Sequence, residues 1–105
     1  MLGGSSGSPM LSKSPTVMVE LTTAKGTVFS AQADGVELRT TDGVIAINPL
    51  EESYLHLTHT TRITLRVGTE FHTFALENAA ASLREGRLTV LAETIHQVEP
   101  AADET

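Results

Sequence analysis

The chain has 105 residues and no cysteine, which allows one domain and excludes disulfides, thiol catalysis and thiolate metal sites. Its 13 acidic and 7 basic residues give a net charge of −6, which offers no electrostatic reason to bind nucleic acid or anionic lipid. No apolar run approaches the roughly 20 residues of a membrane-spanning helix, and the N-terminus lacks the pattern of a signal peptide.

The ordered part of the chain is expected to begin near Thr16. Residues 1–15 are rich in glycine, serine and proline without helix or strand periodicity, and we expect a flexible tail there. Residues 16–21 then alternate, with Val17, Val19 and Leu21 on one face. This alternation predicts a half-buried strand.

Two hairpin-type dipeptides compete in the next segment. Residues 22–26 would reverse the chain, and a second extended segment opens at Val28. Asp34-Gly35 and Asp42-Gly43 both favour tight turns, but residues 36–41 alternate as a strand between them. We predict the hairpin at Asp42-Gly43, because a β-branched segment follows at once, and a bulge or kink at Asp34-Gly35.

Further alternating segments at residues 54–60, 62–67 and 71–76 predict more strands, and Asn48-Pro49 would end the strand before them. Short strands with regular turn signals predict an all-β fold, an antiparallel β-sandwich of about 8–10 short strands. The residues expected to contribute to the core are Val19, Leu38, Ile47, Ile63, Leu65, Val90 and Leu91.

Residues 77–85 permit two interpretations. Asn78 could cap a short helix, residues 79–81 are alanines, and Gly86 is placed as a helix C-terminal glycine. A turn at Gly86 would instead make a hairpin, because residues 88–92 form an apolar run typical of a buried strand. We favour the strand.

The run Leu-Thr-Val-Leu-Ala-Glu-Thr at residues 88–94 resembles the closing strand V-T-V-L-A-D/E-T of the β-sandwich domain in the epsilon subunit of rotary, F-type ATP synthases. The similarity covers roughly residues 17–95. Residues 28–30 match the family's V/M-F-S, residues 41–43 its acidic glycine turn, and residues 62–66 its V-L-R-I-R strand. The resemblance favours a strand at residues 77–85 as well.

The resemblance implies an epsilon-like sandwich over residues 16–97, preceded by the tail at 1–15 and followed by an acidic tail at 98–105. Two family motifs are altered. The family's P-G-H is replaced by Pro49-Leu50-Glu51, and its S-G-G by Glu77-Asn78-Ala79. The family's second, helical domain would begin about where this sequence ends.

The resemblance also implies a function. It predicts a non-catalytic central-stalk subunit that couples the gamma shaft to the membrane c-ring during proton-driven ATP synthesis or hydrolysis. Gamma and the c-ring would be its partners, and it would lie peripherally at the cytoplasmic face of the membrane without inserting. A free-standing, diverged β-sandwich that serves as a protein-interaction module is the alternative.

Six residues are carried over from the family as partner contacts. Thr41, Asp42 and Gly43 would touch the ring, and Pro49, Leu50 and Glu51 would lie near gamma. For Asp42 a second role stays open, because an aspartate at a turn often supports its own backbone.

The sequence predicts no catalytic, cofactor or metal site. A zinc site needs three or four converging ligands, and His56 and His59 would lie on opposite faces of a strand. His56 and His72 could approach each other across strands, but the sequence implies no partner carboxylate for them. The side chains of the adjacent Glu51 and Glu52 point apart. Neither a nucleophile elbow nor a glycine-rich phosphate loop is present.

Overall fold

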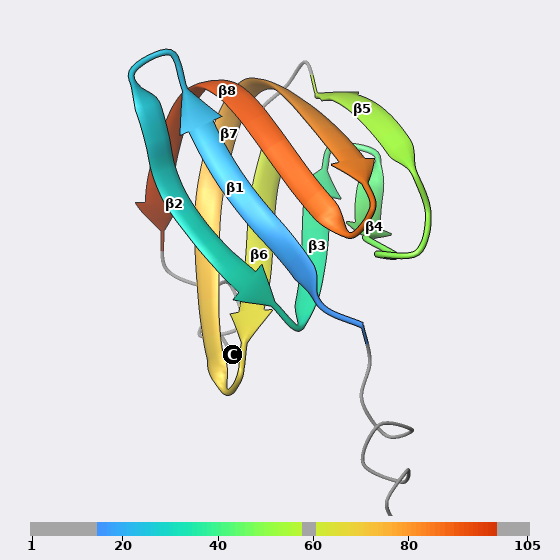
Figure 1. The fold of residues 1–105 in the computed structure, drawn as a ribbon. Helices are drawn as coiled ribbons and strands as arrows, with labels where there is room; N and C mark the ends of the chain where they lie inside the picture. Colours follow the sequence, from blue (N-terminus) through green and yellow to red (C-terminus); the bar gives the residue numbers. More distant parts are fainter. Residues whose placement is uncertain (1–14, 58–60, 99–105) are drawn as a thin grey trace, which may run out of the picture.

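The computed structural model describes residues 15–57 and 61–98 (Figure 1). These residues form eight strands and no helix, so the all-β prediction is confirmed. The strands are β1 (Val17–Thr23), β2 (Gly26–Ala33), β3 (Gly35–Thr40), β4 (Gly43–Ala46), β5 (Ser53–Leu57), β6 (Thr61–Val67), β7 (Glu70–Arg84) and β8 (Arg87–Val98). The tails expected at 1–15 and 98–105 lie outside the described residues, apart from Pro15 and Val98. No helix that could cross a membrane occurs in the described ranges.

The strands form two layers that share β7 and β8 (Figure 1). The first half of β7 pairs with β6, and its second half pairs with β5. The first half of β8 pairs with β1 on its other side. One layer is therefore β2-β1-β8-β7-β5, and the other is β8-β7-β6-β3-β4. Within the described strands, β1 and β8 run parallel and every other pair is antiparallel.

The inward-facing side chains of β7 and β8 change parity halfway along each strand. They are Phe74, Leu76, Ala79, Ala81 and Leu83 in β7, and Leu88, Val90, Ala92 and Ile95 in β8. Side chains of a regular strand alternate between faces. Each strand therefore has one interruption of its pleat, which lies between Leu76 and Ala79 in β7 and between Ala92 and Ile95 in β8. At this interruption both strands pass from one layer into the other.

Asn78 lies at the interruption of β7 with a φ of 49°. Asparagine is one of the few non-glycine residues that tolerate this left-handed region. Its Nδ2 donates a hydrogen bond of 2.6 Å to Oε1 of Glu93, which lies at the interruption of β8. The hydroxyl of Thr94 donates to Oε1 of Glu77 at 3.0 Å, beside the same point. Asn78 thus adopts the left-handed backbone conformation at a position where the epsilon pattern has glycine.

The strand interpretation of residues 77–85 is confirmed, because β7 runs without a break to Arg84. Alanines 79–81 pair with β5 on one side and β8 on the other. Backbone pairing on both sides outweighs the helix propensity of alanine, which is a weak preference per residue. The turn after β7 is Glu85-Gly86, with φ values of 51° and 75°. Two positive φ values in a two-residue hairpin are typical of a type I′ turn.

The predicted kink at Asp34-Gly35 is the corner where the chain leaves one layer for the other. The Asp34 amide donates to the carbonyl of Arg66 at 2.7 Å, and its Oδ2 accepts a 2.7 Å bond from the Gly68 amide. Gly35 lies beside the side chain of Arg66, since a Cβ added there would be 3.6 Å from Nη2, an ordinary van der Waals distance. The corner is therefore tied to the β6–β7 turn.

The core between the layers is mostly aliphatic. Val19, Leu38, Ile63, Leu65 and Val90 are fully buried as predicted, and Ile47 is half-buried against them. The prediction for Leu91 is wrong, because its side chain is 56% exposed on the outer face of β8. The run at residues 88–92 is thus covered on one face only. Phe29 of β2 contacts Phe74 of β7 across the layers, with ring centroids 4.9 Å apart.

We expect Asn78→Ala to have a lower free energy of unfolding than Asn78→Gly by about 1–2 kcal/mol. Both variants lose the hydrogen bond to Glu93, but only alanine has a Cβ that disfavours the positive φ. Urea denaturation of the two variants measures the difference. Equal midpoints would show that the left-handed conformation is not required for the strand to cross between layers.

Candidate partner-binding surface

The first predicted contact segment, Thr41 to Gly43, forms the tip of the β3–β4 hairpin, as expected. Thr40 pairs with Gly43, so the two loop residues are Thr41 and Asp42. Gly43 opens β4 with a φ of 130°, a conformation that favours glycine. Thr41, Asp42 and Gly43 are all exposed. The hairpin tip can therefore meet a partner without rearrangement of the sheet.

The side chain that supports this turn belongs to Thr40. Its Oγ1 accepts a 3.0 Å hydrogen bond from the Asp42 amide and donates one of 3.0 Å to the Gly43 carbonyl. The Asp42 carboxylate makes no hydrogen bond or ion pair within the described part of the chain. The turn thus does not depend on the carboxylate of Asp42, which remains exposed. A threonine two residues before an aspartate in a turn could have indicated this arrangement from sequence.

The second predicted segment, Pro49 to Glu51, forms a turn after β4. Asn48 holds this turn, because its Oδ1 accepts from the Leu50 amide at 3.0 Å and its carbonyl accepts from the Glu51 amide at 3.1 Å. Pro49 is half-buried, whereas Leu50 is 78% exposed. A large apolar side chain therefore projects into solvent where the epsilon pattern has glycine.

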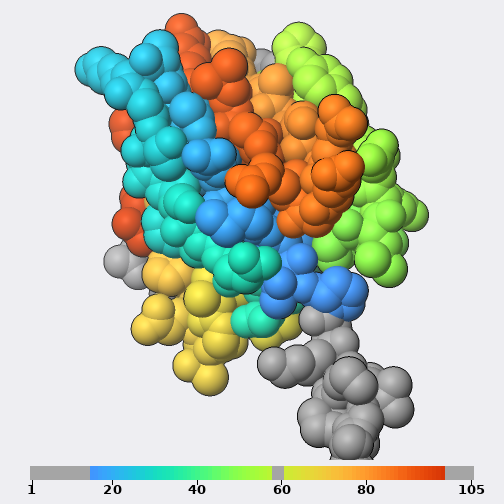
Figure 2. Space-filling view, in the orientation of Figure 1, coloured from blue at the N-terminus to red at the C-terminus, as the bar shows by residue number. Residues whose placement is uncertain are grey.

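Leu50 lies beside the hairpin that joins β7 and β8. Pro49, Leu50 and Glu52 line a hollow together with Glu85 and Gly86 of that turn. In Figure 2, the green surface of residues 50–57 borders the orange surface of the β7–β8 hairpin. A partner that covered Leu50 would therefore also meet the end of this hairpin.

The six predicted residues form two separate surfaces. The hairpin tip precedes β4 and the Leu50 turn follows it, and four strand residues between them span about 13 Å. This separation suits contact with two different partners more than one compact site.

The histidines and adjacent glutamates do not assemble into a chemical site among the described residues. His56 pairs with Ala80 and His96 with Ala75, whereas His59 lies outside the described ranges. His72 lies 5.3 Å from the Phe29 ring, and its Nε2 lies 3.4 Å from Oε1 of Glu70. In residues 15–57 and 61–98, no group of three or more histidines and carboxylates could hold a metal ion.

We expect Thr40→Val to lower the free energy of unfolding by about 1 kcal/mol, because the hairpin loses the hydrogen bonds of the hydroxyl. Asp42→Asn is the matched control and should change it by less than about 0.5 kcal/mol, since its carboxylate has no described partner. Urea denaturation compares them. A larger loss for the asparagine variant would mean that the carboxylate stabilises its own turn.

Comparison with known proteins agrees with this fold. The family model for the β-sandwich domain of the ATP synthase delta/epsilon chain matches residues 16–98. No curated protein matches the sequence.

The solved structures that resemble the chain include two chains of mitochondrial ATP synthases. One is a chain of the Euglena gracilis mitochondrial ATP synthase, in a cryo-EM structure of OSCP, F1 and the c-ring, with a TM-score of 0.67 and 11% identity. The match covers 81% of this chain and 55% of that one. The other comes from the central stalk and c-ring of the Tetrahymena thermophila mitochondrial enzyme, with a TM-score of 0.55 and 15% identity over 79% of this chain and 67% of that one.

At such identities the solved structures establish a shared fold, whereas the family match covers nearly all of the described strands. The chain belongs to the ATP synthase delta/epsilon family, through its β-sandwich domain.

Proposed function

We propose that this protein is a central-stalk subunit of a rotary ATP synthase, which joins the gamma subunit to the c-ring. The observation that carries the proposal is the family match over residues 16–98, on a sandwich with two exposed turns at opposite ends of β4. The Tetrahymena relative comes from a central stalk and c-ring assembly, which supports the same role.

Such a subunit has no reaction of its own and acts through shape and contact area. We infer that it contributes no catalytic group and requires no cofactor. Torque passes through it only if its two layers move as one body. The shared strands β7 and β8, and the corner at Asp34, meet that requirement because covalent chain connects the layers at each crossing.

The two turns would contribute differently to binding. Asp42 at the hairpin would pair with a basic residue in a polar loop of the ring, and an exposed pair of this kind contributes about 0–1 kcal/mol. Burial of a leucine side chain such as Leu50 contributes about 1.5–3 kcal/mol. We therefore propose that the hairpin mainly orients the subunit on the ring. Burial of Leu50 would provide most of the affinity of the second turn for gamma.

The location follows from the partners. A subunit held between gamma and the c-ring lies at the membrane surface, on the cytoplasmic face that carries the catalytic part of the synthase, without entering the bilayer. Proton movement would occur in the ring and not in this chain.

One observation favours the alternative of a free-standing interaction module. Leu50 and Glu51 stand where the family has glycine and histidine, so the contact with gamma in relatives cannot be reproduced here atom for atom. An exposed leucine beside the β7–β8 turn would serve an unrelated partner equally well.

Cysteine crosslinking in a reconstituted rotor tests the proposed contacts. A cysteine at Asp42 should crosslink to a loop of the c-subunit, and a cysteine at Glu51 should crosslink to gamma. A cysteine at Glu70 is the control, because it lies beside the β6–β7 turn, at the end of β3 away from the hairpin, and should not crosslink to the ring. If neither Asp42 nor Glu51 crosslinks in a complex that assembles, the free-standing module becomes the better account.

A further inference from the structure

The outer face of the layer β4-β3-β6-β7 gathers positive charge. Arg39 of β3 and Arg62 of β6 lie directly opposite each other, and both are exposed. Arg66 lies on the same face of β6 and is exposed as well. Glu37 of β3 and Glu77 of β7 lie on the same face, so its three arginines outnumber its carboxylates by one. This face therefore carries a small excess of positive charge in a chain whose net charge is −6.

The guanidinium groups of Arg39 and Arg62 have no partner in the described part of the protein. No hydrogen bond or ion pair involves either side chain there. Arg66 differs, because its Nη2 donates to the carbonyl of Asp34 at 3.4 Å. Like charges directly opposite each other across two strands destabilise a sheet. An anionic partner would remove this repulsion and accept hydrogen bonds from guanidinium groups that have no partner among the described residues.

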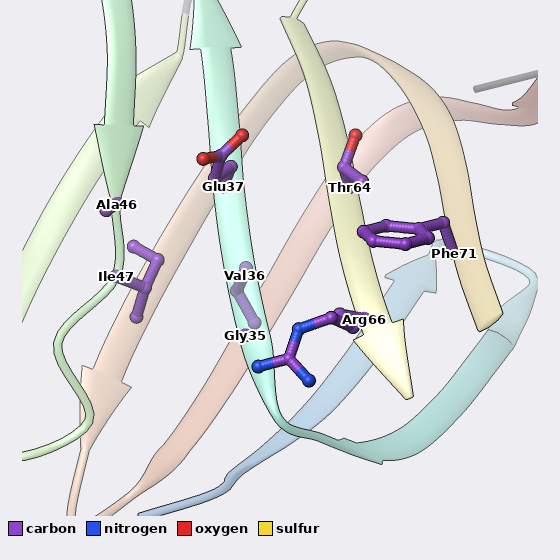
Figure 3. Close-up of a pocket in the computed structure, with 8 residues that line it drawn as sticks. All are labelled: Gly35, Val36, Glu37, Ala46, Ile47, Thr64, Arg66 and Phe71. Atoms are coloured by element: carbon purple, nitrogen blue, oxygen red, sulfur yellow. The ribbon is translucent and has the colours of Figure 1, made fainter. Parts of the chain in front are cut away.

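Apolar side chains flank the arginines on the same face. Val44 lies opposite Arg39 and is 50% exposed, and Phe71 lies opposite Arg66 and is 56% exposed. A hollow of about 280 Å³ lies beside these residues and is also lined by Glu37. Figure 3 shows the Phe71 ring and the Arg66 guanidinium on one side of it and Ile47 on the other. The face thus alternates cationic groups with places for an apolar side chain.

We propose that this face binds an acidic polypeptide segment of a partner protein. Carboxylates of the segment pair with Arg39 and Arg62, for which planar guanidinium groups are well suited, and an apolar side chain enters the hollow beside Phe71. A polypeptide fits better than a membrane or a polynucleotide, because the negative charge of the whole chain opposes approach to an extended anionic surface. The inference does not rest on the proposed function, since it involves neither predicted contact segment.

The test uses the full chain, labelled with ¹⁵N, and a random copolymer of glutamate and tyrosine as the probe. Titration followed by NMR should shift the amide signals of β3, β6 and Phe71. Arg39→Gln combined with Arg62→Gln should weaken binding about tenfold. The matched control is Arg84→Gln combined with Arg87→Gln, which also face each other across a strand pair but flank the β7–β8 turn. This control should weaken binding less than about twofold, as expected for charges remote from the contact.

Several outcomes would overturn the proposal. Equal weakening by the two double variants would show that only net charge matters. Equal affinity for polyglutamate and for the copolymer with tyrosine would show that no apolar side chain of the partner contributes to binding. Stronger, arginine-dependent binding to vesicles of phosphatidylcholine and phosphatidylglycerol would assign the face to lipid. At low salt, the thermal midpoint of the unbound Arg39→Gln, Arg62→Gln variant should lie above that of the unchanged protein, because the repulsion between the arginines is removed. This measurement also shows whether the variant folds. A lower midpoint would mean that the arginines stabilise the sheet.

Discussion

The two-layer structure depends on the paired interruption at Asn78 and Glu93. A strand with regular alternation presents one face to the core along its whole length, so it can serve only one layer. At this interruption β7 and β8 exchange their inward and outward faces together while they remain paired to each other. The hydrogen bond between Asn78 and Glu93 joins the two irregular positions. One long hairpin thereby belongs to both layers, and the layers cannot slide past each other without breaking it.

Alternation in the sequence predicted the strands that behave regularly, and it failed where the pattern itself changes. The inward faces of β1 and β6 could be predicted from Val19 and Leu65, since each strand keeps a single parity. The run at residues 88–92 could not, because a short apolar segment does not reveal whether one face or both are covered. The left-handed conformation of Asn78 was equally hidden, since asparagine before three alanines also begins helices.

The positions of the two candidate turns were predictable from the sequence, but the hydrogen bonding of their side chains was not. The family pattern located the hairpin tip and the turn at Leu50, whereas the exposed carboxylate of Asp42 required the hydrogen bonds of Thr40 to be known. The pairing of Arg39 with Arg62 depends on the register of β3 against β6, which a single sequence does not define. Residues distant in sequence become one surface only through that register.

A stalk subunit must bind gamma, so association of this sandwich with gamma is the most direct test of the proposed role. Calorimetric titration of the folded chain with purified gamma from the same synthase should show saturable one-to-one binding. Leu50→Ala should weaken it by about tenfold, since the apolar contact of the side chain is lost. Absence of binding by the folded chain, or full affinity in the Leu50→Ala variant together with no crosslink at Glu51, would contradict the account.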